Sequence, residues 1–368
     1  MKFGGTSLAT TQNILTAKGI VEADSARTFI IVSAPGKSCQ FPRKITDLLI
    51  DAHARLCYSN VFDIFETVFG RFEALALGLG VDISAEIART REEVLINRCD
   101  YDFVVSRGEY LMAILFAHLL NFKFLDAANY IIIKKNGLVD EVSTRANFAK
   151  LPRNERYVMG GFYGCTEVRP SKTCPPCRNN LKVKTFTRGG SDYSGAIAAV
   201  YLNARLYENF TDTYGVQTAN PAIVKETLSI PEIDYSTLYR LCKAGASVIY
   251  PNCVPLLRRH SMPLKVDCTL DPGKRYTIVG LKRAQSPYFS ITYETKRNIN
   301  KDTVEILCIM NKISFSYDTL CEMLSSHEVY LVSFSKHEFR LIASVSAFVE
   351  VINLLHKSLI AAKSIASL

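Results

Sequence analysis

Apolar residues recur along most of the chain, both in short β-branched runs and in longer stretches at helical spacing. The first run, Thr28–Ser33, predicts a buried strand that leads into the loop Ala34–Lys37. Residues 45–58 and 61–79 repeat apolar positions with a helical period, and a further helix is predicted over residues 108–121. The first part of the chain therefore reads as strand and helix in alternation.

The alternation continues through the middle of the chain. Strands are predicted at Asp100–Ser106 (as a strand or a strand-to-helix junction), Tyr130–Ile133, Leu206–Phe210 and Pro263–Asp267, and helices over residues 192–205 and 236–248. Strands that alternate with helices favour an α/β fold, with a mostly parallel sheet covered on both faces.

The pattern changes near residue 283. Short strands are predicted at Tyr288–Glu294, Val329–Ser335 and Glu338–Ser344, and helices over residues 301–313, 319–326 and 347–357. Elements of this size indicate a small α+β module. We therefore predict two domains, residues 1–282 and residues 283–368.

Composition supports a globular protein of two domains, since 48% of the 368 residues are hydrophobic and 21% are charged. The longest apolar stretch, Leu111–Leu120, is too short for a membrane span of ~18 residues and predicts a buried helix. The opening MKFGGTS lacks the pattern of a secretory signal, and eleven irregularly spaced cysteines suit reduced thiols in a cytoplasm. The net charge of +9 is spread along the chain, so neither a nucleic acid nor a membrane is expected as a partner.

Two pairs of adjacent glycines could contact a phosphate. In Lys2–Ser7, the glycines Gly4 and Gly5 would let the backbone approach an anion with its N–H groups. A helix beginning near Ser7 would add its positive N-terminal end, and Lys2 would neutralise a transferred group. A simple flexible N-terminus is the alternative interpretation of this motif alone.

The second pair, Gly189 and Gly190, follows Arg188 and opens a helix rich in small residues. An ordinary capped helix is one interpretation, because Ser191 or Asp192 could serve as its N-cap. Arg188 favours a ligand site, since a guanidinium can bind a carboxylate or a phosphate in a bidentate manner. Asp192 would then orient a lysine, or receive a metal ion or an ammonium group.

Two further motifs add an acid and a turn. Ser106–Glu109 is either a favourable acidic first turn of a helix or a place where Glu109 binds a substrate ammonium. Gly160–Gly164 is a glycine-dense turn around an aromatic pair. Glycine cradles with a lysine, an arginine and two acids suit phosphoryl transfer onto an anion, which depends on positioning and charge neutralisation.

In this order the motifs resemble those of the aspartate kinases, over most of residues 1–280. The matching segments are Lys2–Ser7, Val32–Ala34, Thr46–Leu49, Ser106–Glu109, Gly161–Gly164, Arg188–Asp192, Thr211–Val216, Thr218–Pro221 and Gly245–Pro251. The resemblance implies a three-layer α/β/α amino-acid-kinase fold with a mostly parallel central sheet. It also implies a C-terminal α+β ACT-like regulatory module that would pair two subunits into a homodimer.

The resemblance further implies that the chain transfers the γ-phosphoryl of ATP to the β-carboxylate of L-aspartate. This reaction is the first step of lysine/diaminopimelate, threonine and methionine biosynthesis. Mg²⁺ would be carried by the ATP phosphates, with no metal site of the protein's own.

Each site residue receives a role from the same resemblance. Lys2 would neutralise the β- and γ-phosphates, and Asp192 would orient Lys2. Arg188 would bind the α-carboxylate of aspartate, and Glu109 its ammonium. The expected aspartate-binding residues are Thr46, Glu109, Phe162, Arg188 and Ser191. The expected nucleotide-binding residues are Gly4, Gly5, Ser7, Ser33, Gly189, Gly190, Thr211 and Asp212.

The chain differs from the family pattern on the nucleotide side. Only Met1 precedes Lys2, where the family has a strand of several apolar residues, so a shortened first strand is expected. Ala222 and Ser247 replace an arginine and a lysine of the family, and Gln217 replaces a common tyrosine. Each lost charge-assisted contact would cost about 1.5–3 kcal/mol.

Other interpretations stay open. The departures suit a catalytically impaired relative that binds aspartate or serves as a regulatory subunit. A kinase of this fold that acts on glutamate is disfavoured by the order of the motifs. Cys165, Cys174 and Cys177 lie in a long segment, where a surface loop is favoured over a zinc site because a fourth ligand is missing.

Overall fold

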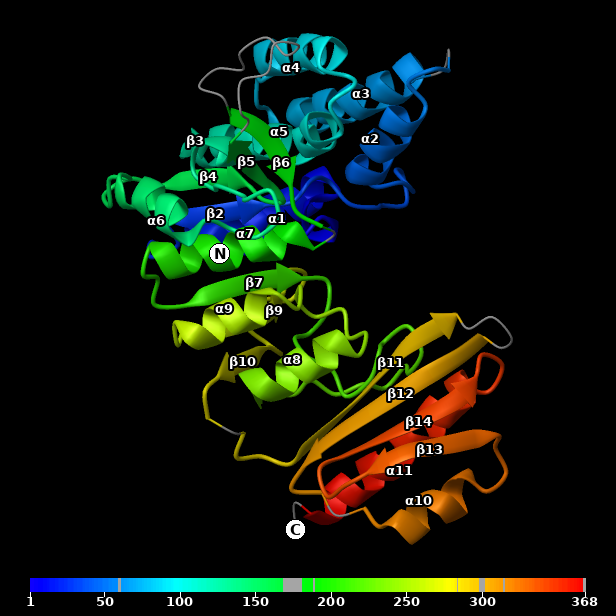
Figure 1. Cartoon of the computed structure of the whole chain (residues 1–368). Helices are drawn as coiled ribbons and strands as arrows, with labels where there is room; N and C mark the ends of the chain where they lie inside the picture. Colours follow the sequence, from blue (N-terminus) through cyan, green and yellow to red (C-terminus); the bar gives the residue numbers. More distant parts are fainter. Residues whose placement is uncertain are drawn as a thin grey trace. The chain divides into compact units, whose positions relative to one another are not determined.

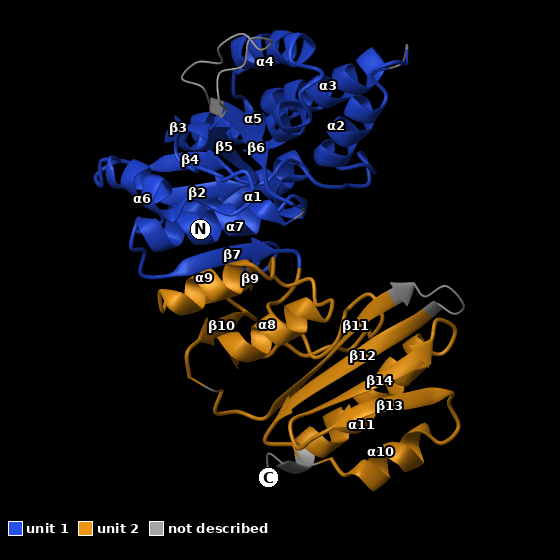
Figure 2. Cartoon of the chain, in the orientation of Figure 1, with its two compact units in different colours: residues 1–212, 268–272 blue, residues 213–267, 273–368 orange. Residues whose placement is uncertain are grey.

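The computed structural model describes residues 1–58, 61–167, 181–187, 189–282, 284–297, 302–313 and 315–366. The chain divides into two compact units (Figure 2). Unit 1 comprises residues 1–212 and 268–272, and unit 2 comprises residues 213–267 and 273–368. This division into units differs from a single boundary near residue 282, and that domain boundary stays a prediction.

Unit 1 is built on parallel strands with helices on both sides (Figure 1). Its strands, in sheet order, are β3 (Lys123–Leu125), β4 (Tyr157–Gly160), β2 (Phe29–Val32), β1 (Lys2–Phe3) and β7 (Tyr207–Thr211). All four neighbouring pairs run parallel. The parallel sheet predicted from the alternation of strands and helices is therefore confirmed.

Strand β1 divides its two side chains between two layers, because successive residues of a strand point to opposite faces. The ring of Phe3 lies against Phe116 of α5 (Tyr101–Leu120) and stacks on Phe210 with 5.2 Å between centroids. Lys2 points to the other face, where it meets Asp192 of α7 (Gly190–Tyr201). One short strand thus supplies an aromatic residue to the core and a cation to the other face.

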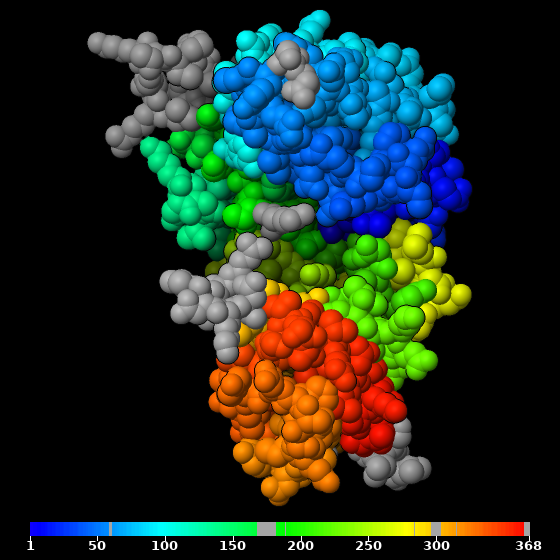
Figure 3. Space-filling model, turned by 90° about the vertical axis from the view of Figure 1, so that its right-hand side faces the viewer, coloured from blue at the N-terminus to red at the C-terminus, as the bar shows by residue number. Residues whose placement is uncertain are grey.

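Helices make up most of the rest of unit 1. They are α1 (Thr11–Glu22), α2 (Ile45–Ala54), α3 (Val61–Leu79), α4 (Ser84–Ile96), α5, α6 (Glu141–Ala149) and α7, with short 3₁₀ turns at Thr6–Leu8 and Ala127–Asn129. On the face drawn in Figure 3, helices α2 to α4 (blue to cyan) cover much of this unit. A hairpin of β5 (Tyr163–Glu167) and β6 (Leu181–Thr185) contacts α5.

Helix α5 is long and apolar enough to cross a membrane by length and composition alone. However, 83% of its most apolar 18-residue window is buried inside the protein, as is typical of the core helix of a globular fold. The buried helix predicted around Leu111–Leu120 is therefore confirmed.

Two local predictions in unit 1 are wrong. Asp100–Ser106 is not a strand, because Asp100 caps α5 by accepting the N–H of Phe103, and the following residues form the first turns of that helix. Tyr130–Ile133 forms only isolated bridges, at Ile132 and Ile133, in place of a strand.

Unit 2 contains two groups of strands. In the first, β10 (Thr277–Gly280) runs parallel to β8 (Glu232–Asp234) and antiparallel to β9 (Leu264–Cys268), with α8 (Tyr235–Lys243) and α9 (Cys253–Arg259) nearby. The second is antiparallel, in the order β11 (Tyr288–Arg297), β12 (Asp302–Asn311), β14 (Glu338–Ser344) and β13 (Val329–Phe334). Helices α10 (Tyr317–Leu324) and α11 (Phe348–Ala366) contribute to one apolar core with this sheet.

The helix predicted over residues 301–313 is wrong, because this segment is strand β12. Leu307, Cys308, Ile309 and Met310 are all buried, so the sequence shows no clear period of two or of 3.6. Antiparallel pairing with β11 over ten positions decides the conformation. The other helices and strands predicted after residue 284 are present, with α11 longer than predicted.

Candidate active site

Lys2 and Asp192, far apart in the sequence, form a nearly buried ion pair. Lys2 Nζ lies 2.7 Å from Asp192 Oδ1, and the side chains are only 9% and 15% exposed. Asn209 Nδ2 donates to the same Oδ1 at 3.4 Å, and the Tyr207 hydroxyl donates to the backbone oxygen of Asp192 at 3.0 Å. The carboxylate is therefore held in place beside the ammonium.

The two glycine pairs lead to this ion pair. Gly4 donates its N–H to Phe210 O, and a Cβ on Gly4 would lie 3.5 Å from Lys2 Nζ, so glycine leaves space beside the ammonium. Gly189 has φ 92°, a left-handed conformation that glycine adopts freely, and it is the N-cap of α7. Asp192 consequently lies in the first turn of α7.

The loops after β1 and β2 are in direct contact. Gly36 donates its N–H to Gly5 O at 2.7 Å, and a Cβ on Gly36 would lie 2.6 Å from the carbonyl carbon of Gly5. A Cβ on Gly5 would lie 2.8 Å from Ala34 O. Ser33 donates its N–H to Phe3 O at 3.2 Å. Both loops follow the carboxyl ends of parallel strands, the edge where ligands bind in open α/β sheets.

Hydroxyl groups connect Ser7 to the predicted adenosine side. Ser7 Oγ and Thr269 Oγ1 lie 2.6 Å apart, and the N–H of Thr269 donates to Thr211 O at 2.9 Å. The Thr211 hydroxyl in turn donates to Asp212 Oδ1 at 3.2 Å. Sequence reasoning missed Thr269, and the available signal was a hydroxyl residue two positions after the predicted strand Pro263–Asp267.

Glu109 carries a buried carboxyl group inside α5. Burial raises its pKa to about 8, although it accepts hydrogen bonds from the N–H of Ala34 and the hydroxyl of Thr46. Glu109 Oε2 is buried and has no hydrogen-bond partner within the described parts of the chain. A buried acceptor without a partner is costly, so this oxygen suits a cationic ligand group or a proton.

The turn after β4 brings Glu109 and Ser191 together. A Cβ on Gly160 would lie 2.9 Å from Glu109 O, and one on Gly161 would lie 2.8 Å from Ser191. Phe162 has φ 76°, and its N–H donates to Ser194 Oγ at 3.1 Å. The segments that carry Thr46, Glu109, Phe162 and Ser191 therefore adjoin one another.

Three predicted positions lie outside the described residues. These are Arg188, Cys174 and Cys177. Cys165 is buried in β5, and burial raises the pKa of its thiol to about 11, so the thiol stays protonated at neutral pH. Over the described ranges, no group of three or more His, Cys, Asp or Glu side chains could hold a metal ion.

The three departures from the family pattern lie in unit 2. The Gln217 amide is occupied locally, because its nitrogen donates to Tyr214 O and to Ser229 Oγ, and its oxygen accepts from Thr227 Oγ1. Ala222 is exposed and donates its N–H to Asn220 Oδ1 at 2.9 Å. Ser247 is exposed and follows α8.

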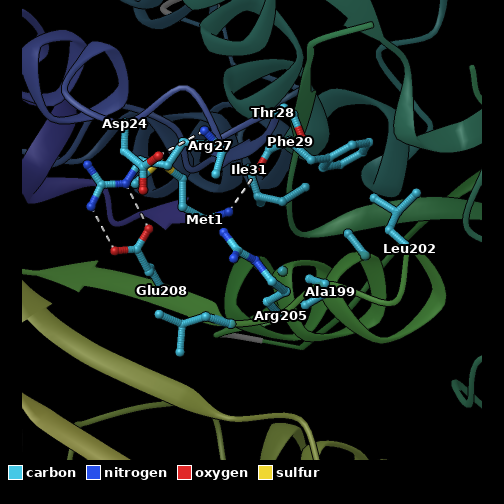
Figure 4. A pocket seen from close by; sticks show the side chains of 15 residues that line it. Met1, Asp24, Arg27, Thr28, Phe29, Ile31, Ala199, Leu202, Arg205 and Glu208 are labelled. Atoms are coloured by element: carbon cyan, nitrogen blue, oxygen red, sulfur yellow. Dashed lines mark hydrogen bonds and ion pairs between the residues drawn. The ribbon is translucent and has the colours of Figure 1, made fainter. Parts of the chain in front are cut away.

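A cavity of about 380 Å³ lies at the other end of β1 (Figure 4). The Met1 amine donates to Phe29 O at 2.7 Å, and burial lowers the pKa of this amine to about 6. Arg27 binds Glu208 through two hydrogen bonds of 2.8 and 2.9 Å. This cavity adjoins the amino ends of the strands, whereas the glycine motifs follow their carboxyl ends. The latter edge is therefore the candidate active site.

Comparisons with known proteins point to the same family. Residues 1–266 match the amino acid kinase family. The chain is 31% identical to aspartokinase 3 of Bacillus subtilis, over 80% of this chain and 66% of that protein. It is 26% identical to an aspartokinase of Chlamydia pneumoniae, over 76% of this chain and 62% of that protein. The chain thus spans less than two thirds of the length of these curated relatives.

Solved structures agree with the fold. The aspartate kinase of Clostridium acetobutylicum superposes with a TM-score of 0.78 at 23% identity, over 97% of this chain and 99% of that one. E. coli aspartokinase III, in complex with aspartate and ADP, superposes with a TM-score of 0.81 at 19% identity, over 97% and 98%. The predicted α/β fold with a small C-terminal module is confirmed.

Proposed function

Because the chain belongs to the amino acid kinase family, we propose that it is an aspartate kinase, which transfers the γ-phosphoryl of ATP to the β-carboxylate of L-aspartate. The names of the relatives and the bound aspartate and ADP of the E. coli enzyme support this choice. The observation that carries it is the Lys2–Asp192 ion pair, which adjoins Gly4 of the first glycine pair and follows the second at the start of α7.

In this proposal Lys2 neutralises charge on the transferred phosphoryl group, and Asp192 keeps its ammonium in position. The phosphates would be bound by backbone N–H groups and hydroxyls, and the adenosine by the end of β7. The residues proposed for the nucleotide are Gly4, Gly5, Ser7, Ser33, Gly189, Gly190, Thr211 and Asp212. Catalysis would depend on positioning and electrostatics, as is usual for phosphoryl transfer.

The unpartnered oxygen of Glu109 supports an ammonium ligand, and Glu109 would therefore bind the α-ammonium of aspartate. Arg188 would bind the α-carboxylate. Thr46, Phe162 and Ser191 would complete the aspartate site. Their segments adjoin Glu109 and the first turn of α7. Aspartate bound there would have its β-carboxylate directed toward Lys2 and Asp192.

Mg²⁺ would enter with the nucleotide. Carboxylates in groups of three or more are absent from the described chain, so the ion would take most of its ligands from phosphate oxygens and water. When bound with ATP, Mg²⁺ would neutralise part of the phosphate charge. We further propose a cytoplasmic enzyme that pairs into a homodimer through its C-terminal antiparallel sheet.

A second candidate is a catalytically impaired relative that binds aspartate as a regulatory subunit. Ala222 and Ser247 favour it, since each stands where the family has a cation. The two candidates differ in one property, because only the first requires a competent nucleotide site.

The test is release of ADP from MgATP with and without L-aspartate, by the purified full chain. Removing the Lys2 charge with K2M should lower turnover by about 10²–10³-fold, the usual cost of one electrostatic contact to the transition state. K18M is the matched control, because Lys18 forms a partly exposed pair with Glu22 on α1. Folded protein without aspartate-dependent ADP release contradicts the proposal. Aspartate binding without nucleotide binding favours the second candidate.

A further inference from the structure

Arg71, in the middle of α3, is a buried cation that no sequence motif indicated. Its side chain is among the largest fully buried in the protein, at 2% exposure. Its terminal nitrogens donate to three backbone oxygens, those of Ala9 at 3.0 Å, Gly36 at 2.6 Å and Arg43 at 3.2 Å. The guanidinium also lies 4.6 Å from the centre of the Phe41 ring.

The three acceptors belong to three loops of the candidate site. Ala9 ends the turn that follows the first glycine pair, and Gly36 lies in the loop after β2. Arg43 lies two residues before α2, the helix that carries Thr46. Since Gly36 also donates to Gly5 O, one side chain holds together the segments proposed to bind phosphate and aspartate.

The charge of Arg71 has no acidic partner within the described part of the chain. No carboxylate forms an ion pair with it among the residues that the structure describes, and its Nε is buried without a hydrogen-bond partner. Burial lowers the pKa of the guanidinium to about 10, which still leaves it charged at neutral pH. Other buried arginines of proteins are usually paired with acids, because an unpaired buried charge is strongly unfavourable.

We propose that Arg71 is a positioning residue for the polyphosphate site: it fixes the loops around Gly5 and Gly36, and its buried charge is balanced by the phosphates of the bound nucleotide. The proposal rests on the proposed nucleotide-dependent function. It assigns no direct contact between Arg71 and the ligand. The guanidinium acts through the backbone groups that it holds and through its electrostatic field.

The experiment separates the charge from the scaffold. R71K keeps the charge and part of the hydrogen bonding to the backbone oxygens, whereas R71M loses both. Calorimetric titration with MgADP, on protein verified as folded by circular dichroism, should give dissociation constants about threefold weaker for R71K and at least about tenfold weaker for R71M. A purely structural role predicts that the loss of affinity in each variant follows its loss of free energy of unfolding, which urea denaturation of the same samples measures.

R91M is the matched control. Arg91 lies in α4, over the ring of Phe69 in α3, and its charge is balanced by Glu66 and Glu73. R91M should therefore change MgADP affinity less than about twofold. Equal MgADP affinities of wild type and R71M, or of R71K and R71M, overturn the inference alone. Wild-type protein that binds MgADP but shows no aspartate-dependent turnover overturns the proposed function alone. Wild-type protein that binds no MgADP overturns both.

Discussion

Glu109 illustrates how burial prepares a single side chain for a ligand. Its carboxyl accepts from Ala34 and Thr46 through hydrogen bonds, yet Oε2 lacks a partner over the described chain. Desolvation is the largest effect and raises the pKa of Glu109 to about 8, so its carboxyl group is mostly protonated at pH 7 when no ligand is bound. An incoming ammonium would reverse this preference, because it stabilises the carboxylate.

The first prediction concerns the pH dependence of aspartate binding. Below pH 8 the ligand must displace the proton of Glu109, so apparent affinity should rise with pH by up to about tenfold per unit and level off above pH 8. Calorimetry at pH 7, in buffers of different ionisation enthalpy, should detect release of up to one proton. E109Q should bind more weakly and release none. Affinity that is independent of pH between 6 and 8 contradicts this role of Glu109.

At the scale of residues, short motifs were informative where backbone geometry demands particular residue types. The glycine pairs predicted anion loops, and the structure brings Lys2 and Asp192 to one place beside them. Arg71 and Thr269 could not be predicted in this way. Arg71 occupies an ordinary position of an amphipathic helix, and its importance comes only from loops that fold against it.

At the scale of elements, the contact between two loops sets a steric limit. A Cβ on Gly36 would lie 2.6–2.8 Å from backbone atoms of Gly5 and Thr6. Rotation of a side chain cannot remove this overlap, because the atoms in contact belong to the backbone. Gly19, inside α1, would meet nothing within 4 Å. The two glycines therefore form a matched pair for substitution.

We predict opposite effects for G36A and G19A. G36A should lower the free energy of unfolding by about 1–3 kcal/mol, since the loops must separate to admit the methyl group. G19A should raise it by about 0.5–1 kcal/mol through helix propensity. Urea denaturation measures both, and MgADP titration should show weaker binding for G36A only. A neutral effect of G36A would show that the loops are not packed as described.

Element prediction from the sequence succeeded where periodicity was clear and failed where it was not. Helix α3 and strand β14 were predicted closely, because their apolar positions follow one period. Strand β2 was predicted from a short β-branched run that ends at the loop Ala34–Lys37. Strand β12 was predicted as a helix, because it buries residues on both faces and only long-range pairing with β11 fixes it. The start of α5 was predicted wrongly because the β-branched pair Val104-Val105 favours a strand, whereas Asp100 is the N-cap of the helix.

At the scale of the whole molecule, unit 2 joins residues from both sides of the predicted boundary near residue 282. Ala219 and Val224 pack in the same core as the antiparallel sheet and α11. Thr218 accepts the N–H of Leu228 and hydrogen-bonds His356 Nε2 at 2.8 Å. The Thr218 hydroxyl can donate to or accept from the imidazole, so this hydrogen bond forms with either tautomer of the ring.

The last prediction follows from this histidine. Burial lowers the pKa of His356, against a smaller opposing effect of Glu226, so the folded protein binds fewer protons here than the unfolded chain. The stabilising contribution is complete above about pH 6.5, the ordinary pKa of histidine, and is lost as pH falls through the lowered value. The free energy of unfolding should therefore fall below pH 6.5. The H356Q variant keeps a hydrogen-bond acceptor but has no titrating group, so its free energy of unfolding should fall less over the same pH range. Identical pH profiles of the two proteins would contradict the assignment.

Strand β1 consists of only two residues, Lys2 and Phe3, and their side chains point to opposite faces of the sheet. Insertion of one codon between Lys2 and Phe3 would put both side chains on the same face of the sheet, and deletion of Phe3 would remove its ring from the core. With Lys2 kept in place, the insertion would turn the Phe3 ring toward Asp192; with Phe3 kept in place, it would turn the ammonium toward Phe116. A change in the length of this segment should therefore be tolerated less well than a change of side chain. A library for directed evolution of this segment should vary side chains at constant length.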